Sequence, residues 1–219
     1  MCGRFSFSPN EIIIEERFDI DIEEGVYQPR YNCAPSQNLA VISNAEPGRL
    51  SFYRWGLIPF WAKDISVGNR MINAKAETIL EKVSFRHAFR GNRCLVLSDG
   101  FYEWKKEKND RIPYRITLKN GEPFAMAGIW DTWKNPAGAV VNSFAIITTT
   151  PNTLIESIHD RMPVIILREN EKDWLNRNDT DLLLHFLQPY PAGDMEAYPV
   201  SKLVNSPSND RPEVIRRMN

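Results

Sequence analysis

The sequence predicts a single α+β domain with a mostly antiparallel, barrel-like β core and short peripheral helices. Three observations support this fold class: short β-prone apolar runs recur between turn signals, helical stretches are short and scattered, and regular β-α-β alternation is missing. The length of 219 residues, with 42% apolar and 25% charged residues, suits one globular domain over residues 1–219.

The first half of the chain carries two clear local signals. Ser8-Pro9-Asn10-Glu11 offers a capping serine, a proline at the first helical position and a glutamate three residues after the cap, which predicts a helix ending near Phe18. Pro47-Gly48 predicts a turn before a strand over residues 50–55. Short helices are expected over residues 74–81 and 84–89.

The second half is predicted to contain most of the sheet. Strands are expected over residues 93–97 and 101–105, joined through Ser98-Asp99-Gly100. The turn signals Asn109-Asp110 and Asn120-Gly121 frame two further strands. The remaining expected elements are strands over 114–118, 124–130, 143–148, 164–167 and 196–199, and helices over 152–158, 171–176 and 179–187.

Composition argues against several classes of protein. No stretch approaches the roughly 20 apolar residues of a transmembrane helix, and Pro9-Asn10-Glu11 comes too early for a signal peptide, so we expect a cytoplasmic protein without a membrane partner. Cys2, Cys33 and Cys94 are odd in number and far apart, which fits neither a disulfide framework nor a zinc site. We expect no metal or cofactor, and nothing in the sequence requires more than a monomer.

The charge is distributed unevenly, although the net charge is only −1. Residues 10–24 hold seven acids and one base, whereas residues 49–93 hold nine bases and three acids. The basic segment also contains several aromatic residues, a combination that suits single-stranded nucleic acid because cations meet phosphates and rings stack on bases. A solvated basic face with its aromatic residues in the core is the alternative.

Cys2 is the most informative single residue. Methionine is normally removed before a residue as small as cysteine, which would leave an α-amine and a thiol on adjacent carbons. This amine has a pKa of roughly 7.7–8.0, so part of it is free near neutral pH. A 1,2-aminothiol can open an amide, or it can form an imine with an aldehyde and then close a thiazolidine ring. The position alone is equally compatible with an ordinary second residue.

Three polar residues elsewhere in the chain are candidate partners for Cys2. Glu103 lies among aromatic residues in a predicted strand; facing inward it would have a raised pKa and act as a general acid or base, whereas facing outward it would be ordinary. His159 lies in a charged loop, where it could move protons. Asn73 either caps the helix that follows or holds a nucleophile or developing oxyanion.

Set in order, these motifs resemble those of the SOS-response-associated peptidase (SRAP) family, the abasic-site processing proteins. The resemblance covers Cys2 to about Ser201, nearly the whole chain. The matching segments are Met1-Cys2-Gly3-Arg4-Phe5, Arg30-Tyr31-Asn32-Cys33-Ala34-Pro35, Trp55-Gly56-Leu57-Ile58-Pro59-Phe60-Trp61, Asn73-Ala74-Lys75-Ala76-Glu77-Thr78, Gly100-Phe101-Tyr102-Glu103-Trp104, His159-Asp160-Arg161-Met162-Pro163 and Pro199-Val200-Ser201.

The resemblance implies covalent capture of abasic sites in single-stranded DNA, with Cys2 as the nucleophile and Asn73 as the residue that orients it. It implies that Glu103 is an acid or base and that His159 exchanges protons at the sugar. Residues implied at the flanking phosphates are Arg4, Lys75, Thr148 and Arg161, and those implied in a wall against neighbouring bases are Pro35, Phe60 and Trp61. The family commonly has arginine where this chain has Lys75, which keeps the charge but loses bidentate phosphate geometry.

Three functions therefore compete. The first is capture of an abasic site as a thiazolidine after removal of Met1, with chromosomal DNA as the partner and β-elimination as a side activity. The second is a cysteine peptidase of the N-terminal-nucleophile type, whose substrate is its own Met1–Cys2 bond. The third is a non-covalent single-stranded DNA-binding protein that uses the basic, aromatic segment.

Overall fold

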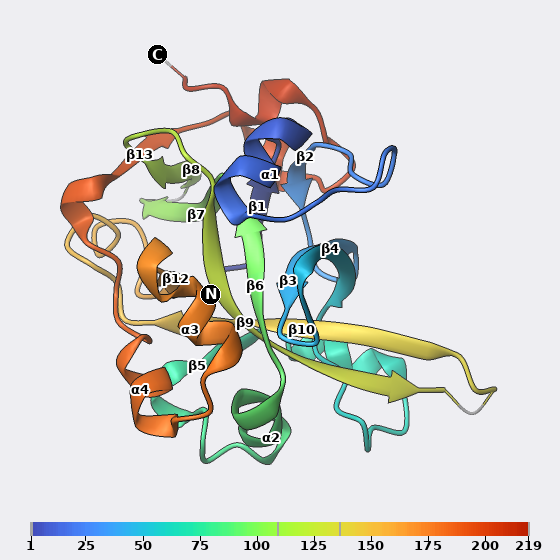
Figure 1. Ribbon diagram of the computed structural model, residues 1–219. Coiled ribbons are helices and arrows are strands. Elements are labelled where there is room, and N and C mark those ends of the chain that lie inside the picture. The colour runs from blue at the N-terminus through green and yellow to red at the C-terminus, as the bar shows by residue number, and fades with distance from the viewer. Residues whose placement is uncertain (1, 109, 136, 219) are drawn as a thin grey trace.

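Five strands close into a barrel. The computed structural model describes residues 2–108, 110–135 and 137–218 (Figure 1). Around the barrel each strand pairs with the next, and β9 pairs with β10 to complete the circle. In spatial order the strands are β10 (Val140–Thr149), β4 (Glu46–Trp55), β3 (Asn38–Ser43), β6 (Arg93–Ser98) and β9 (Phe124–Lys134). The predicted barrel-like, mostly antiparallel core is confirmed; β10 pairs in parallel with β4.

A second, five-stranded antiparallel sheet takes in the N-terminal strand. Its order is β13 (Met195–Pro199), β8 (Asp110–Leu118), β7 (Gly100–Glu107), β1 (Phe5–Phe7) and β2 (Arg30–Cys33). The chain passes from β6 in the barrel to β7 in this sheet at Asp99, which makes an ion pair with buried Arg115 and accepts hydrogen bonds from Ser6 and Ser8. The two sheets are therefore joined directly beside β1.

Short strands and helices surround these sheets. The edge strands are β5 (Asn73–Lys75), β11 (Met162–Pro163) and β12 (Ile165–Ile166). The α-helices are α1 (Glu11–Phe18), α2 (Val83–Gly91), α3 (Glu171–Asn176) and α4 (Thr180–His185). The 3-10 helices are Ile65–Arg70, Ala76–Thr78, Arg168–Asn170, Ala192–Asp194, Lys202–Asn205 and Pro212–Ile215. Among the described residues, no helix is both long and apolar enough to cross a bilayer.

Alternation along the barrel strands divides the apolar core into two large clusters. In β3, Leu39 and Val41 pack with Cys2, Phe5 and other residues of the second sheet. Their neighbours Ala40 and Ile42 pack in the cluster that holds the buried residues of all four α-helices. Because successive side chains of a strand point to opposite faces, the same strands bury the N-terminus on one side and the helices on the other.

Several local predictions were wrong in instructive ways. Asn10, not Ser8, caps α1, because its side chain accepts the N–H of Ile13 while the Ser8 hydroxyl donates to Asp99. Pro47-Gly48 lies within β4, and the turn before it is at residues 44–45. Residues 74–81 form strand β5 and a 3-10 helix, because β10 pairs with the first part. Residues 152–158 form turns instead of a helix.

Other local predictions were right. The helix over Glu171–Asn176 matches to the residue, and Asp179 is the N-cap of α4. The predicted strands over 93–97, 101–105, 114–118, 124–130, 143–148 and 196–199 all lie within observed strands. In place of the strand over 164–167 the structure has the two-residue strands β11 and β12. The Asn120-Gly121 turn is present, closed by a hydrogen bond from Gly121 N–H to Leu118 O, but the expected hairpin is wrong because β8 and β9 lie in different sheets. The Asn109-Asp110 turn includes residue 109, which lies outside the described residues.

The predicted basic segment does not all face solvent, because Arg93 is fully buried. Its guanidinium donates to five backbone carbonyls, at Phe89 and Arg90 in α2 and at Trp174, Leu175 and Arg177 in and after α3. These carbonyls lie at helix C-termini, where a cation is favoured. Arg93 therefore joins two helices to the barrel and is not available to bind DNA.

Replacing Arg93 with methionine should lower the free energy of unfolding by about 3 kcal/mol, because five carbonyls lose a donor and three of these hydrogen bonds are buried. Urea unfolding would measure this loss. Arg90→Met is the matched control, since the Arg90 side chain is exposed and its loss should cost about 0.5 kcal/mol or less. Equal losses in the two variants would contradict the structural role of Arg93.

Candidate active site around Cys2

The pairing of β1 with β7 places Cys2 in the protein interior. Phe5 in β1 lies opposite Phe101 in β7, and Tyr102 N–H donates to Arg4 O at 2.9 Å. Cys2, just before this strand, is completely buried, and its Sγ lies 3.9 Å from Arg4 O. Burial is the main cause that raises the pKa of its thiol, so Cys2 carries a protonated sulfur near neutral pH.

Asn73 contacts the Cys2 backbone. Its strand, β5, pairs in parallel with β10, so that Asn73 lies opposite Ile146. Its Nδ2 donates to Cys2 O at 2.8 Å, while its Oδ1 is buried and accepts no hydrogen bond from any residue the structure describes. Of the two alternatives for Asn73, the helix-capping one is wrong, since it stands within a strand.

Glu103 faces inward. It shares a face of β7 with Phe101, which packs in the same cluster as Cys2, and the Glu103 side chain is only 3% exposed. Burial, with a smaller contribution from Asp160, raises its pKa to about 8. Glu103 is therefore a protonated carboxylic acid at neutral pH, as a general acid requires.

His159 approaches Glu103 from the loop that follows the 152–158 turns. Its Nε2 lies 3.7 Å from Glu103 Oε2, and its Nδ1 accepts the N–H of Arg161 at 3.0 Å. Nδ1 also lies 3.0 Å from the exposed carboxylate of Asp160 and 3.3 Å from Arg161 O, so the position of the proton on the neutral ring depends on which of these contacts Nδ1 makes. Burial lowers the pKa of His159, which favours that neutral ring.

The residues expected at phosphates divide into two groups. Register places Thr148 of β10 opposite Lys75 of β5, and Arg161 donates to Thr148 O at 2.6 Å. Arg161 also forms a bidentate ion pair with Glu77, which sequence reasoning did not single out although it lies in the Asn73–Thr78 motif. This pairing lowers the pKa of Glu77 and already balances the charge of Arg161. Lys75 keeps an exposed side chain.

Arg4 points to a different part of the molecule. Its Nη1 donates to Asn32 Oδ1 at 2.7 Å and to Val204 O at 2.6 Å, in the C-terminal 3-10 helix Lys202–Asn205. Asn32 in turn donates to carbonyls at Ser206 and Asn209. Arg4 thus holds the C-terminal segment against the start of the chain, and burial lowers its pKa.

The predicted wall residues Phe60 and Trp61 are exposed, at 60% and 51%. Half-buried Pro35 precedes Ser36, whose N–H donates to Trp55 O at the end of β4, five residues before Phe60. By contrast, Tyr53 and Trp55 of the same basic segment are core residues. The alternative with aromatic residues in the core is therefore right for Tyr53 and Trp55, whereas Phe60 and Trp61 face solvent.

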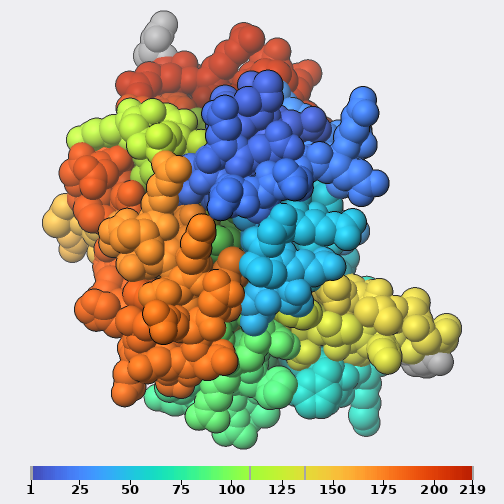
Figure 2. Space-filling model, viewed as in Figure 1, coloured from blue at the N-terminus to red at the C-terminus, as the bar shows by residue number. Residues whose placement is uncertain are grey.

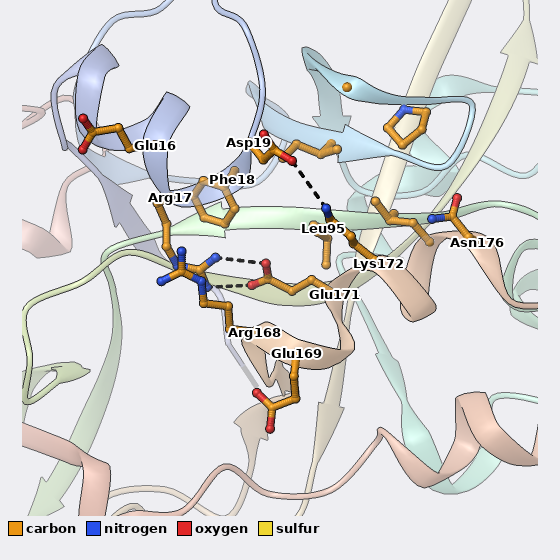
Figure 3. A pocket seen from close by; sticks show the side chains of 14 residues that line it. Glu16, Arg17, Phe18, Asp19, Leu95, Arg168, Glu169, Glu171, Lys172 and Asn176 are labelled. Carbon is orange, nitrogen blue, oxygen red and sulfur yellow. Dashed lines mark hydrogen bonds and ion pairs between the residues drawn. The ribbon is translucent and has the colours of Figure 1, made fainter.

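A cavity of about 600 Å³ lies away from these residues, between α1, α3 and the β3–β4 hairpin (Figure 3). Its walls include the buried ion pair of Arg17 with Glu171 at 2.7 Å and the exposed pair of Lys172 with Asp19. None of the predicted site residues lines it. Among the described residues, no group of three or more histidine, cysteine, aspartate or glutamate side chains is arranged to hold a metal ion.

Comparison with known proteins identifies the family of this chain. Residues 1–207 match the family described as SOS response associated peptidase (SRAP). Abasic site processing protein YoqW of Bacillus subtilis strain 168 is 54% identical over 222 residues, covering 98% of this chain and 99% of that protein. Abasic site processing protein HMCES of Xenopus tropicalis is 30% identical over 225 residues, covering 88% of this chain and 67% of that protein.

Solved structures with the same fold are also similar. A crystal structure of a Bacteroides thetaiotaomicron protein has a TM-score of 0.91 at 30% identity, over 100% of both chains. A second, from Bordetella bronchiseptica, has a TM-score of 0.81 at 27% identity, over 91% of this chain and 100% of the other.

The raised pKa of Glu103 predicts a pH dependence of stability. The unfolded chain releases this proton near pH 4.5, whereas the folded chain holds it to about pH 8, so the folded state binds more protons in between and stability falls as pH rises through that window. Glu103→Gln removes the effect. Its free energy of unfolding should rise relative to the wild type from pH 5 to pH 8, by about 1.4 kcal/mol for each unit of pKa difference.

Urea unfolding across this pH range would test the prediction. Glu107→Gln, an exposed glutamate in the same strand, is the control and should track the wild type. Parallel pH profiles for wild type and Glu103→Gln would show that the Glu103 pKa is not raised.

Proposed function

Because the chain belongs to the SOS response associated peptidase (SRAP) family, we propose that it recognises abasic sites in single-stranded DNA and captures them covalently through Cys2 after Met1 is removed. The names of its relatives YoqW and HMCES support abasic-site processing. The observation that carries the proposal is the meeting of Cys2, the Asn73 amide and the protonated acid Glu103, with His159 beside Glu103.

The chemistry needs only these groups. His159 moves a proton between the ring oxygen and the hydroxyl of the closed sugar, which frees the aldehyde. The Cys2 amine adds to the aldehyde carbon, and Glu103 protonates the hydroxyl of the resulting carbinolamine, which leaves as water. The nitrogen of the iminium then returns a proton to the Glu103 carboxylate, which gives the imine and restores the acid. The Cys2 S–H then adds across the C=N bond. Sulfur bonds to carbon, the proton ends on nitrogen, and the thiazolidine ring closes.

The state of the thiol favours this order of events. Because burial keeps the Cys2 sulfur protonated, the α-amine, with its pKa of roughly 7.7–8.0, is the readier nucleophile near neutral pH. Asn73 supports the same step, since its bond to Cys2 O fixes the backbone and its open Oδ1 can accept a hydrogen bond from the amine or the sugar.

A self-processing peptidase is the second candidate. The protonated Glu103 near Cys2 could also protonate the leaving amine during cleavage of the Met1–Cys2 bond. The raised thiol pKa argues against rapid thiolate attack on peptides in trans. This activity is compatible with capture, because it would produce the free amine that capture requires.

Protein with a free Cys2 should form a denaturation-resistant adduct with a single-stranded oligonucleotide that contains an abasic site. Intact mass spectrometry should show the mass of protein plus DNA less one water, as imine formation followed by ring closure requires. Cys2→Ser should form only a reversible imine, trapped by borohydride. Cys33→Ala is the control, because Cys33 is a second buried free cysteine and its variant should react normally.

The same spectra separate the competing functions. A confirmed N-terminal cysteine without any adduct would sink the capture mechanism. Lesion-independent binding without mass gain would favour a non-covalent DNA-binding protein. Retention of Met1 in Cys2→Ala, with loss of Met1 in the wild type under identical conditions, would support self-processing.

Asn73→Ala should slow adduct formation by about 10- to 100-fold without changing the adduct mass, because the Cys2 backbone loses its orienting donor. Quenched time courses at saturating DNA would measure the rate. Asn176→Ala, at an exposed position in α3, is the matched control. An unchanged rate in Asn73→Ala would remove Asn73 from the mechanism.

A further inference from the structure

The exposed rings of Phe60 and Trp61 belong to a backbone segment that is fixed by hydrogen bonds to neighbouring side chains. The segment, residues 58–62, follows β4 and lies against the β9–β10 hairpin, which extends beyond the rest of the barrel (Figure 1; Figure 2). These large apolar side chains are exposed, although nearby residues of the same segment are buried: Ile58 is 0% and Ala62 is 8% exposed.

Three side chains of the hairpin bind alternate residues of this segment. Ser143 Oγ accepts the N–H of Ile58 at 2.7 Å, and Asp131 Oδ2 accepts the N–H of Phe60 at 3.0 Å. Trp133 Nε1 donates to Ala62 O at 2.7 Å. Ser143 and Asp131 lie directly opposite each other in the β9–β10 register, and Trp133 follows two residues along β9. The segment is therefore tied at positions 58, 60 and 62 to one face of the hairpin.

Asp131 is the central one of these three contacts. Asp131 is 7% exposed, and its Oδ1 accepts the N–H of Thr132 at 2.8 Å. A carboxylate buried this deeply is costly unless it is hydrogen-bonded, and here both oxygens are engaged by backbone donors. On either side of it, Ile58 and Ala62 pack with Trp133, so that Phe60 and Trp61 are left to point outward.

We propose that Asp131 is a positioning residue that holds Phe60 and Trp61 as a rigid platform for the base beside the lesion. The inference rests on the proposed function together with the resemblance, which implies a wall of these rings against neighbouring bases, and it extends that role to a buried residue behind the rings. Rings ordered in advance lose less conformational entropy when a base stacks on them, so a fixed platform binds a flanking base more tightly than a mobile one. Asp131 thereby sets the preference for a base next to the lesion.

Equilibrium binding measures this role apart from the covalent step. Fluorescence anisotropy would compare Cys2→Ala protein with Cys2→Ala/Asp131→Ala protein on labelled single strands that carry tetrahydrofuran, an unreactive abasic analogue. In one strand the analogue is flanked by ordinary bases, and in the other by further tetrahydrofuran residues. Asp131→Ala should weaken binding to the base-flanked strand about tenfold and leave binding to the baseless strand little changed.

Three further variants make the test specific. Asp131→Asn keeps one acceptor and should fall between wild type and Asp131→Ala. Ser143→Ala removes the neighbouring acceptor and should show a smaller loss with the same dependence on flanking bases. In a Phe60→Ala/Trp61→Ala background, Asp131→Ala should have no additional effect, because the platform is already gone. Asp181→Ala, an exposed aspartate in α4, is the control.

Equal losses on the two strands, no loss on either strand, or a full additional loss in the Phe60→Ala/Trp61→Ala background would overturn the inference. If Asp131→Ala does not fold, the same criteria apply to Asp131→Asn and Ser143→Ala. Failure of the proposed function is a different result: the protein with a free Cys2 forms no adduct with abasic DNA, whatever its dependence on flanking bases.

Discussion

The insertion of β1 between β7 and β2 is the constraint on which the rest of this structure depends. Buried backbone N–H and C=O groups must be paired, so a strand at the very start of the chain becomes a central strand of a sheet and draws the preceding residues inside. Cys2 is buried for this reason, although it is adjacent to a chain terminus. The ion pair of Arg115 with Asp99, and the bonds of both to Ser6, hold this junction where the barrel and the second sheet meet.

Burial of the same region determines its chemistry. An acid on the inward face of β7 cannot be well solvated, so the Glu103 pKa rises to about 8, and the Cys2 thiol also stays protonated. The region thus combines a proton donor with a protonated sulfur, and under the proposed function this suits an amine-first reaction with an aldehyde better than thiolate attack on a peptide. Stability therefore falls as the pH rises from about 4.5 to about 8, so burial of Glu103 has a cost in stability at neutral pH.

Around this centre the polar and aromatic contacts are already formed in the protein without DNA. Arg161 is already paired with Glu77 and bound to Thr148, and residues 58–62 are tied to the β9–β10 hairpin through Asp131. Such pre-ordering lowers the entropy lost on binding and places each group within the narrow geometry that catalysis needs. To contact a phosphate, Arg161 must either release Glu77 or bind Glu77 and the phosphate together. Exposed Lys75 needs no such rearrangement.

The sequence by itself determined the fold class, most strands and the ordered motifs that identify the family, because period-two patterning, turn residues and residue order are local properties. It could not decide between alternatives that depend on distant partners. Asn73 became a strand residue because β10 pairs with it, and Arg93 was buried because two helix ends needed a donor. Glu103 faced inward because its face of β7, shared with Phe101, packs in the cluster that contains Cys2. Likewise, the support of Phe60 by Asp131 joins residues 71 positions apart. Only tertiary packing decides such contacts, since each depends on where another segment lies.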